Sequence, residues 1–350
     1  PLRRQRQMCI RDRDGYGLSL HLLQQAKEDG VDTILTCDNG IAAIDEIAWA
    51  KAQKMTVLVT DHHAVPFEEH EGRRTEKKSL ADAVVNPHQQ DCGYPYKELC
   101  GAGVAWNVIR VLYENYDMDK REAEDLLDFV AMATVCDVMS LTGENRILVK
   151  EGLKRIRHTK NIGLQALMQA CNVQPENISA YHFGYVLGPC VNATGRLDTA
   201  RHALRLFETG QETEAEEIAR DLVDLNQERK ELTLQGVEMA KKLCEEGGYE
   251  NDPILVLFLP DVHESIAGLI AGRIREMYNR PVFVLTRGEE GVKGSGRSTE
   301  NYSMYENMCG CAELFTKFGG HPMAAGLSLP EENVEKFRRK INENCPLTVE

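Results

Sequence analysis

The run Thr60-Asp61-His62-His63 places one carboxylate and two imidazoles on consecutive residues. It directly follows the apolar stretch 55–59, which predicts a buried strand that emerges at this point. Such a run can hold a metal ion, although paired histidines also occur at surfaces or as hydrogen-bond partners. Ligands from elsewhere in the chain are needed to decide between these interpretations.

Two aspartates lie where other elements are expected to end. Asp38 follows a strand-like segment and precedes Asn39-Gly40, which favours a tight turn. Asp137 follows the helix predicted over residues 121–135. Either residue could simply cap a turn or a helix. Together with His62, however, they supply the oxygen and imidazole ligands that suit Mn²⁺ or Mg²⁺ rather than a structural zinc.

Alternating helical and strand-like segments predict a parallel sheet that positions these ligands. The expected strands cover residues 31–36, 55–60 and 83–85, and the expected helices cover residues 19–29, 41–53 and 101–113. This alternation is typical of βαβ units, in which ligands bind at the C-terminal ends of the strands. Asp38 and the Asp-His-His run both lie at that edge.

The second half of the chain predicts a long helix followed by another α/β unit. The helix is expected over residues 212–246 and would extend on the order of 50 Å. Strands expected over residues 253–259 and 281–285 flank a helix that follows Glu264. We place the boundary near Gly247-Gly248 and predict the α/β class, with two α/β domains, a parallel sheet in the first, a long connecting helix and an active-site cleft between them.

The composition indicates a globular protein with more than one core, because 350 residues exceed one ordinary domain. No apolar run approaches the ~20 residues that span a bilayer and no secretory pattern is visible, so we expect no membrane segment. The 11 cysteines lack paired CxxC spacing, which favours reduced thiols in the cytoplasm. The net charge of −14 argues against a nonspecific nucleic-acid coat protein, but not against an enzyme in which metals and local arginines contact phosphates.

Several motifs, in order, resemble the DHH phosphoesterase superfamily and, within it, the RecJ family of bacterial single-strand-specific exonucleases. The superfamily pattern comprises the Asp-Asn-Gly, Asp-His-His and Cys-Asp motifs. The segments that resemble RecJ proteins more narrowly are Asp14–Ser19, Leu187–Arg196, Lys293–Ser298 and Gly319–Gly326. The resemblance spans about residues 14 to 340, and the last two segments are specific signatures of a DHH-associated domain.

The resemblance implies a phosphodiesterase centre with two divalent metal ions, Mn²⁺ or Mg²⁺. Asp38 would bridge the two ions, while His62 and Asp137 would complete the coordination of one of them. His63 would contact the scissile phosphate, and Asp61 would orient the histidines. The implied reaction is 5′-to-3′ hydrolysis of single-stranded DNA in repair and recombination.

The resemblance implies substrate contacts in three further segments. Ser295 and Arg297 lie among glycines that let a phosphate approach, and the family uses this segment to hold a 5′ end; a flexible exposed loop is the alternative. His321 would approach the nucleic-acid backbone or else be a buried hydrogen-bond partner. Asn192 and Arg196, in an expected loop, would line the same cleft, although Arg196 could instead pair with a nearby acid.

Some features differ from the family pattern. Residues 1–13 look like a flexible basic tail or non-native sequence, and no strand with the family's first aspartate-rich motif precedes Asp14. Cys190 stands where an arginine is common. We expect a fragment with weak metal binding and low activity. Its predicted parts are an N-terminally truncated DHH domain over residues 14–210, a connecting helix over 211–248, a DHH-associated domain over 249–342 and the start of a missing region over 343–350.

Three functions stay open. An exonuclease would bind single-stranded DNA at its 5′ end, act as a monomer and could work with a single-strand-binding protein or a helicase. A nuclease of short oligonucleotides or a nucleotide phosphatase shares the metal motifs. A noncatalytic scaffold would keep only the fold. The RecJ-like segments favour the exonuclease, and a scaffold has no chemical need for the ligand set.

Overall fold

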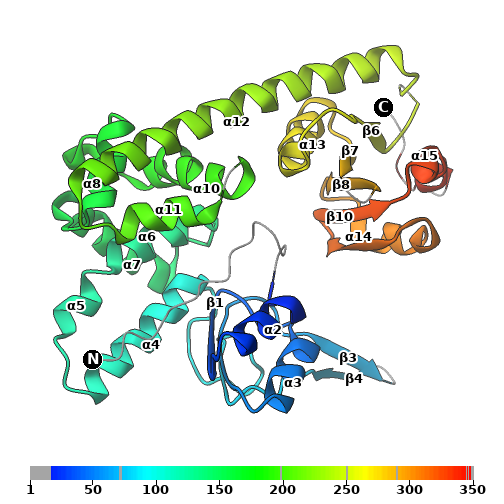
Figure 1. Cartoon of the computed structure of the whole chain (residues 1–350). Coiled ribbons are helices and arrows are strands. Elements are labelled where there is room, and N and C mark those ends of the chain that lie inside the picture. Colours follow the sequence, from blue (N-terminus) through cyan, green and yellow to red (C-terminus); the bar gives the residue numbers. More distant parts are fainter. Residues whose placement is uncertain are drawn as a thin grey trace. The chain divides into compact units, whose positions relative to one another are not determined.

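The computed structural model describes residues 17–70, 73–197, 199–249, 251–288, 291–343, 345 and 347 (Figure 1). The expected tail over residues 1–13 and the segment Asp14–Tyr16 lie outside this range. The chain divides into two compact units, residues 1–224 and 225–350. The division falls inside helix α12 (Glu212–Glu246), whose bounds are those that the sequence predicts. The predicted domain limits stay a prediction.

The first unit contains the predicted parallel sheet. Strands β1 (Thr33–Cys37), β2 (Thr56–Thr60) and β5 (Ala83–Val85) lie side by side in the order β1-β2-β5, and both pairings are parallel. Helices α2 (Leu20–Glu28) and α3 (Ile44–Ala52) pack against it. The alternating residues Val57 and Val59 of β2 are buried in this core, which fixes the face that the strand presents. A polar hairpin, β3 (Phe67–His70) and β4 (Arg73–Glu76), was not predicted.

The remainder of the first unit is helical. Its α-helices are α4 (Gly101–Asn115), α5 (Lys120–Glu124), α6 (Leu127–Cys136), α7 (Gly143–Arg155), α8 (Ile162–Ala170), α9 (Ala180–His182), α10 (Gly188–Leu197) and α11 (Ala200–Glu208). Between α9 and α10 lies a π-helical turn, η3 (Phe183–Leu187). Most of these helices, together with α12, bury apolar side chains in one shared core.

Two helical predictions need correction. The helix predicted over residues 121–135 is two helices, because the amide of Leu126 bonds to the carbonyl of Ala123 in a tight turn between α5 and α6. The expected loop over Leu187–Arg196 is part of a helical run. Leu187, Cys190 and Ala193 are all buried, and their spacing of three residues forms an apolar helical stripe. The glycines of this segment favour a loop, so the sequence alone did not indicate the apolar stripe.

The second unit is a five-stranded mixed sheet covered on both faces. Its order is β6-β7-β8-β10-β9, with β6 and β7 parallel and the other neighbours antiparallel. The strands are β6 (Leu255–Phe258), β7 (Val282–Gly288), β8 (Gly291–Arg297), β9 (Lys317–His321) and β10 (Ala324–Leu329). Helix α13 (Glu264–Tyr278) packs on one face, while α14 (Met304–Cys309) and α15 (Val334–Glu343) pack on the other.

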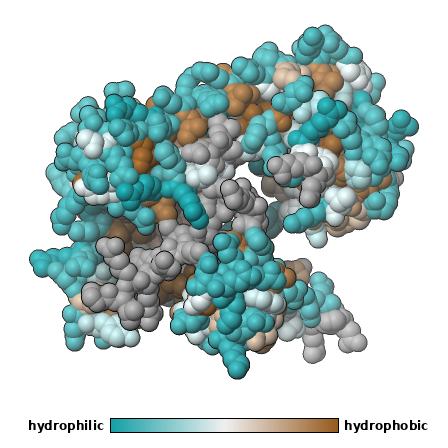
Figure 2. All heavy atoms as spheres, viewed as in Figure 1, coloured by the Kyte–Doolittle hydropathy of each residue, from teal (hydrophilic) through white to brown (hydrophobic). Residues whose placement is uncertain are grey.

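The visible surface is largely hydrophilic, with hydrophobic residues in small groups (Figure 2). In the part of the chain that the structure describes, no helix combines the length and the apolar character that crossing a bilayer requires. Scattered exposed apolar side chains of this kind are normal on folded proteins.

Candidate metal centre

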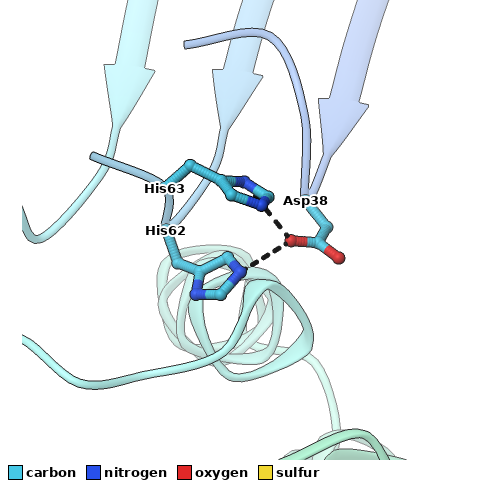
Figure 3. A group of neighbouring side chains, drawn as sticks. All are labelled: Asp38, His62 and His63. Atoms are coloured by element: carbon cyan, nitrogen blue, oxygen red, sulfur yellow. Dashed lines mark ion pairs between the residues drawn. The ribbon is translucent and has the colours of Figure 1, made fainter. Parts of the chain in front are cut away.

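The C-terminal ends of β1 and β2 bring Asp38, His62 and His63 together (Figure 3). Cys37 pairs with Thr60 across the two parallel strands, so the residues that follow leave the sheet at the same edge. One ligand atom from each of the three side chains lies within 4.8 Å of the other two. The Asp-Asn-Gly and Asp-His-His motifs therefore meet where the sequence predicts.

A strained turn directs the Asp38 carboxylate away from the sheet. Asp38 has a positive φ of 60°, a conformation that aspartate tolerates better than most residues. The turn is closed by Thr36, whose hydroxyl donates to the carbonyl of Asn39 at 2.6 Å. Gly40 follows with φ 104°, and a Cβ there would lie 2.9 Å from Thr36 Oγ1. The Asp-Asn-Gly sequence is thus needed for the turn itself.

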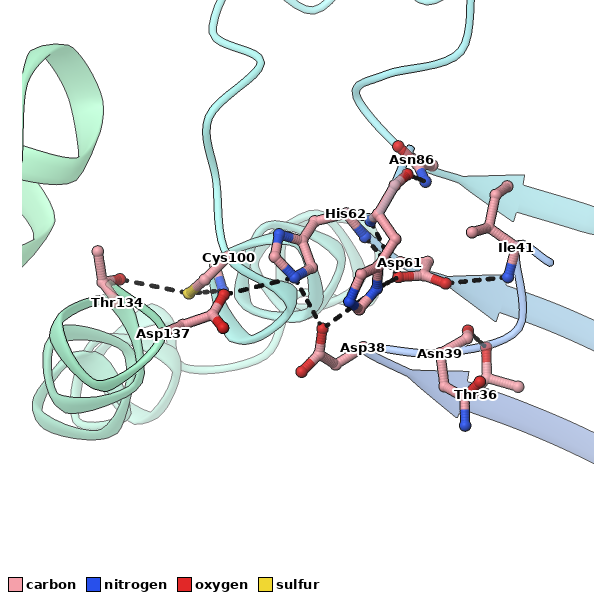
Figure 4. A network of polar contacts seen from close by, with 12 residues as sticks. Thr36, Asp38, Asn39, Ile41, Asp61, His62, Asn86, Cys100, Thr134 and Asp137 are labelled. Atoms are coloured by element: carbon pink, nitrogen blue, oxygen red, sulfur yellow. Dashed lines mark hydrogen bonds and ion pairs between the residues drawn. The ribbon is translucent and has the colours of Figure 1, made fainter. Parts of the chain in front are cut away.

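Asp61 is a buried organiser of the histidines (Figure 4). Only 1% of the residue is exposed. Its Oδ2 accepts from the amide of Ile41 at 2.9 Å, and its Oδ1 accepts from the amides of His62 and His63 at 2.7 and 3.2 Å. Oδ1 also lies 2.7 Å from His63 Nδ1. This contact orients the His63 side chain, which is 61% exposed.

The hydrogen bonds to Asp61 also keep it charged. Burial alone would raise its pKa, but the donors on Ile41, His63 and His62 together lower the pKa below the ordinary value. An anion held in this way favours a proton on His63 Nδ1, the ring nitrogen that faces it. Asp61 is therefore arranged to position His63 rather than to bind a ligand directly.

His62 is placed as a metal ligand would be. Its ring is buried, and Nε2 lies 2.9 Å from Asp38 Oδ1 and 3.4 Å from Asp137 Oδ2. The contact with Asp38 is an ion pair that lacks ideal hydrogen-bond geometry. Two carboxylates therefore face one buried imidazole nitrogen. This nitrogen and the two carboxylates are a suitable ligand set for a divalent cation.

The neighbouring charges control the protonation of His62. Asp38 raises the pKa of the imidazole most strongly, burial counteracts this, and Asp137 and Asp61 raise the pKa further. In the absence of a cation, a proton on His62 partly neutralises these carboxylates. Because a bound metal requires neutral imidazole, it would take over the role of that proton. The residues present thus fit a divalent metal ion.

Asp137 both ends helix α6 and faces His62. It is the C-cap of α6, with its amide donating to the carbonyl of Ala133 at 2.9 Å, and its carboxylate faces His62. The next residue, Val138, has φ 56° and is 88% exposed. A β-branched residue rarely adopts this conformation, so the helix ends abruptly just beside the metal centre.

The N-terminus of α4 contributes a contact that the sequence interpretation missed. Gly101 lies against Asp38, and a Cβ there would fall within 2.5 Å of Asp38 Oδ1. The preceding Cys100 caps the helix and contacts Thr134 of α6 at 3.3 Å. The positive end of the helix dipole thus lies near a carboxylate. Glycine at the predicted start of this helix was the available signal.

Ser295, Arg297 and His321 belong to the second unit and lie on strands. Ser295 and Arg297 are half-buried in β8, so the alternative of a flexible exposed loop is wrong. A Cβ on Gly268 of α13 would lie 2.8 Å from a terminal nitrogen of Arg297 and 3.5 Å from Ser295 Cβ. His321 ends β9 and is exposed, so it is not a buried hydrogen-bond partner.

Asn192 and Arg196 both lie on α10. Asn192 is exposed, whereas the Arg196 side chain lies outside the described part of the chain. Cys190 is buried, with its sulfur 3.7 Å from that of Cys171. A side chain that points into this helical core cannot take over the phosphate contact of an arginine.

Two family models match different parts of this chain. Residues 3–134 match the model of the DHH family, N-terminal domain, and residues 251–345 match the DHHA1 domain. The single-stranded-DNA-specific exonuclease RecJ of Haemophilus influenzae is 37% identical over 94% of this chain and 58% of the relative. The corresponding Bacillus subtilis protein is 33% identical over 95% of this chain and 41% of its own length. The chain thus spans about half the length of these curated relatives.

Solved structures agree with the sequence matches. A crystal structure of exonuclease RecJ bound to manganese has a TM-score of 0.79 and 31% identity, and covers 95% of this chain and 80% of that chain. RecJ of Thermus thermophilus in complex with Mn²⁺ has the same TM-score with 30% identity, over 95% of this chain and 48% of that chain. On the strength of its motifs, its fold and these matches, the chain belongs to the RecJ family of DHH proteins.

Proposed function

We propose that this chain forms the catalytic part of a metal-dependent exonuclease that hydrolyses single-stranded DNA from the 5′ end. The observation that carries the proposal is the buried His62 Nε2, which lies 2.9 Å from a carboxylate oxygen of Asp38 and 3.4 Å from one of Asp137. The relatives from Haemophilus influenzae and Bacillus subtilis are single-stranded-DNA-specific exonucleases, which supports the choice of substrate.

Asp38, His62 and Asp137 are proposed as metal ligands for two Mn²⁺ or Mg²⁺ ions. The bound ions would supply a water of lowered pKa and positive charge close to the scissile phosphate. Asp61 holds His63 through the 2.7 Å contact between Oδ1 and Nδ1. His63, with Nε2 free of that contact, is proposed to contact the scissile phosphate.

Ser295, Arg297 and His321 are proposed to contact the 5′ end of the strand, with Asn192 and Arg196 contributing further polar contacts. A guanidinium and neighbouring backbone amides suit a phosphate, and the half-buried setting of Arg297 restricts its rotamers. Because the chain has a net charge of −14, binding must depend on such local groups rather than on a general basic surface.

The biological setting is part of the same proposal. We expect a monomeric enzyme of DNA repair and recombination in the bacterial cytoplasm, working on strands that a helicase or a single-strand-binding protein presents. The alternatives are a nuclease of short oligonucleotides, a nucleotide phosphatase and a noncatalytic scaffold. The hydrogen bonds that orient His63 argue against a scaffold, since a scaffold has no use for a positioned imidazole.

The test is hydrolysis with Mn²⁺ of three substrates, namely a long 5′-phosphorylated single strand, the corresponding duplex and a dinucleotide. Release of mononucleotides from the 5′ end of the single strand alone is the expected result. Digestion of only the dinucleotide would favour the short-oligonucleotide nuclease. The variant His62→Ala controls for contaminating nucleases, and it should lose activity while retaining its circular dichroism spectrum.

A further inference from the structure

Two exposed tyrosines of the first unit stack on each other. Tyr181 and Tyr185 are 62% and 73% exposed. Their ring centroids are 5.1 Å apart and their planes are inclined by only 24°. Most of the surface of both rings therefore stays in water, so core packing does not account for the pair.

The backbone explains why the rings lie together. The two tyrosines are four residues apart in the helical run of α9 and η3, a spacing that puts side chains on one face. The π-helical turn η3, Phe183–Leu187, contains Tyr185, and such turns often occur at functional sites. The pair is thus a local feature of a helix that then continues into α10.

The same turn packs closely against the end of α6 that carries Asp137. The thiol of Cys136 donates to the carbonyl of Phe183 at 3.4 Å. A Cβ on Gly184 would lie 3.4 Å from Cγ1 of Val135, and a Cβ on Gly188 would collide with the sulfur of Cys136. Neighbours of Tyr185 on both sides therefore contact the two residues that precede Asp137.

We propose that Tyr181 and Tyr185 form a stacking platform for the bases of a single-stranded nucleic acid whose backbone reaches the metal centre. The proposal rests on the proposed function and adds a base-contacting site to it. Every base has a flat face, so stacking on aromatic rings gives affinity without sequence preference. In a chain with a net charge of −14, such a contact offsets weak attraction for phosphates.

The test measures binding by fluorescence anisotropy at fixed salt, in EDTA so that no strand is hydrolysed. The probes are a labelled dodecathymidylate and a strand of the same length in which abasic sites replace the bases. Tyr185→Ala and Tyr181→Ala should each weaken binding of the thymidylate about tenfold, the usual scale of base–aromatic stacking, and leave the abasic strand unaffected. Tyr185→Phe keeps the ring and should bind within about twofold of the unmodified chain.

Tyr116→Ala is the matched control, because Tyr116 is 74% exposed at the end of α4 and should have no effect. Equal losses on both probes, or no loss on either, would overturn the platform. If the unmodified chain degrades single strands while the alanine variants bind as it does, only the platform fails. If the unmodified chain neither binds nor degrades single strands, both the platform and the proposed function fail.

Discussion

Gly101 and Asp38 are in direct contact, and the contact leaves no room for a side chain on the glycine. A Cβ at this position would lie 2.5 Å from both Cγ and Oδ1 of the aspartate. Gly101 is also the first residue of α4, so the helix can approach the carboxylate with its positive end only because that side chain is missing. The orientation of the Asp38 carboxylate, a proposed metal ligand, thus depends on the lack of a Cβ atom at Gly101.

Gly101→Ala should therefore weaken Mn²⁺ binding at least about tenfold by displacing Asp38, an effect comparable to loss of a residue that orients a metal ligand. Isothermal titration calorimetry measures the affinity, and circular dichroism checks the fold. The matched control is Gly272→Ala, since Gly272 lies in α13 with open space where its Cβ would be. Equal affinities for all three proteins would show that the contact does not matter.

Asp61→Asn tests the organiser of the centre. The amide would place a donor where a carboxylate oxygen now accepts, either opposite Ile41 or opposite His63. A buried clash of this kind costs about 1–3 kcal/mol, so the free energy of unfolding in urea should fall by that amount. The rate of hydrolysis should also fall in molecules that remain folded, because His63 loses its orientation. A variant as stable as the parent would contradict the hydrogen-bond pattern.

His62→Ala and His63→Ala should separate metal binding from catalysis. Removal of the buried His62 imidazole should abolish measurable Mn²⁺ binding. Removal of the exposed His63 should leave Mn²⁺ affinity within about threefold while hydrolysis falls on the order of 100-fold, as expected for a group that acts on the reacting phosphate. A large loss of Mn²⁺ affinity in His63→Ala would instead make His63 a ligand, which its place in the cluster with Asp38 also permits.

The sequence predicts the cluster of side chains at the ends of β1 and β2 better than it predicts the helices that lie near them. Asp38, Asp61 and the two histidines directly follow short strand-like segments, so their meeting at one sheet edge follows from parallel pairing. Asp137 lies far from them in sequence, and its approach depends on how α6 packs, which no local pattern encodes. Cys190 and its helix were missed for a related reason, because glycine and proline nearby suggest a loop while burial of every third residue favours a helix.

Gly268→Ala tests the surroundings of Arg297. The added methyl group would lie 2.8 Å from a terminal nitrogen of Arg297, so the guanidinium must shift while the residue stays on β8. Affinity for a 5′-phosphorylated single strand should fall about threefold to tenfold, as expected for a weakened charge-assisted contact, and affinity for the 5′-hydroxyl strand should not change. Gly272→Ala, on the same helix, is again the control. Equal losses on both strands would mean that Arg297 does not contact the terminal phosphate.

Asp128 gives a prediction for stability against pH. It is buried, and burial raises its pKa, although Thr159 and the amide of Phe129 donate hydrogen bonds to it. The folded chain therefore releases this proton at a higher pH than the unfolded chain, and the free energy of unfolding falls as the pH rises from the ordinary pKa through the raised one. Asp128→Asn should be more stable than the parent at pH 7, with the difference vanishing near pH 4.

Thermal unfolding across this pH range measures the effect of Asp128. Glu216→Gln removes an exposed carboxylate from the same unit and serves as the control. A constant difference between Asp128→Asn and the parent at all pH values would show that the effect comes from packing rather than from charge.

Because Cys37 pairs with Thr60 across β1 and β2, binding of Mn²⁺ should also report whether the two strands have paired in the correct register. A slip of one residue between β1 and β2 would turn the valines of β2 away from their core and move Asp38 by about 3.3 Å relative to the histidines. Molecules with that error could not assemble the ligand set. An immobilised Mn²⁺ column should consequently sort refolded chains by strand alignment, retaining those that paired correctly and passing those that did not.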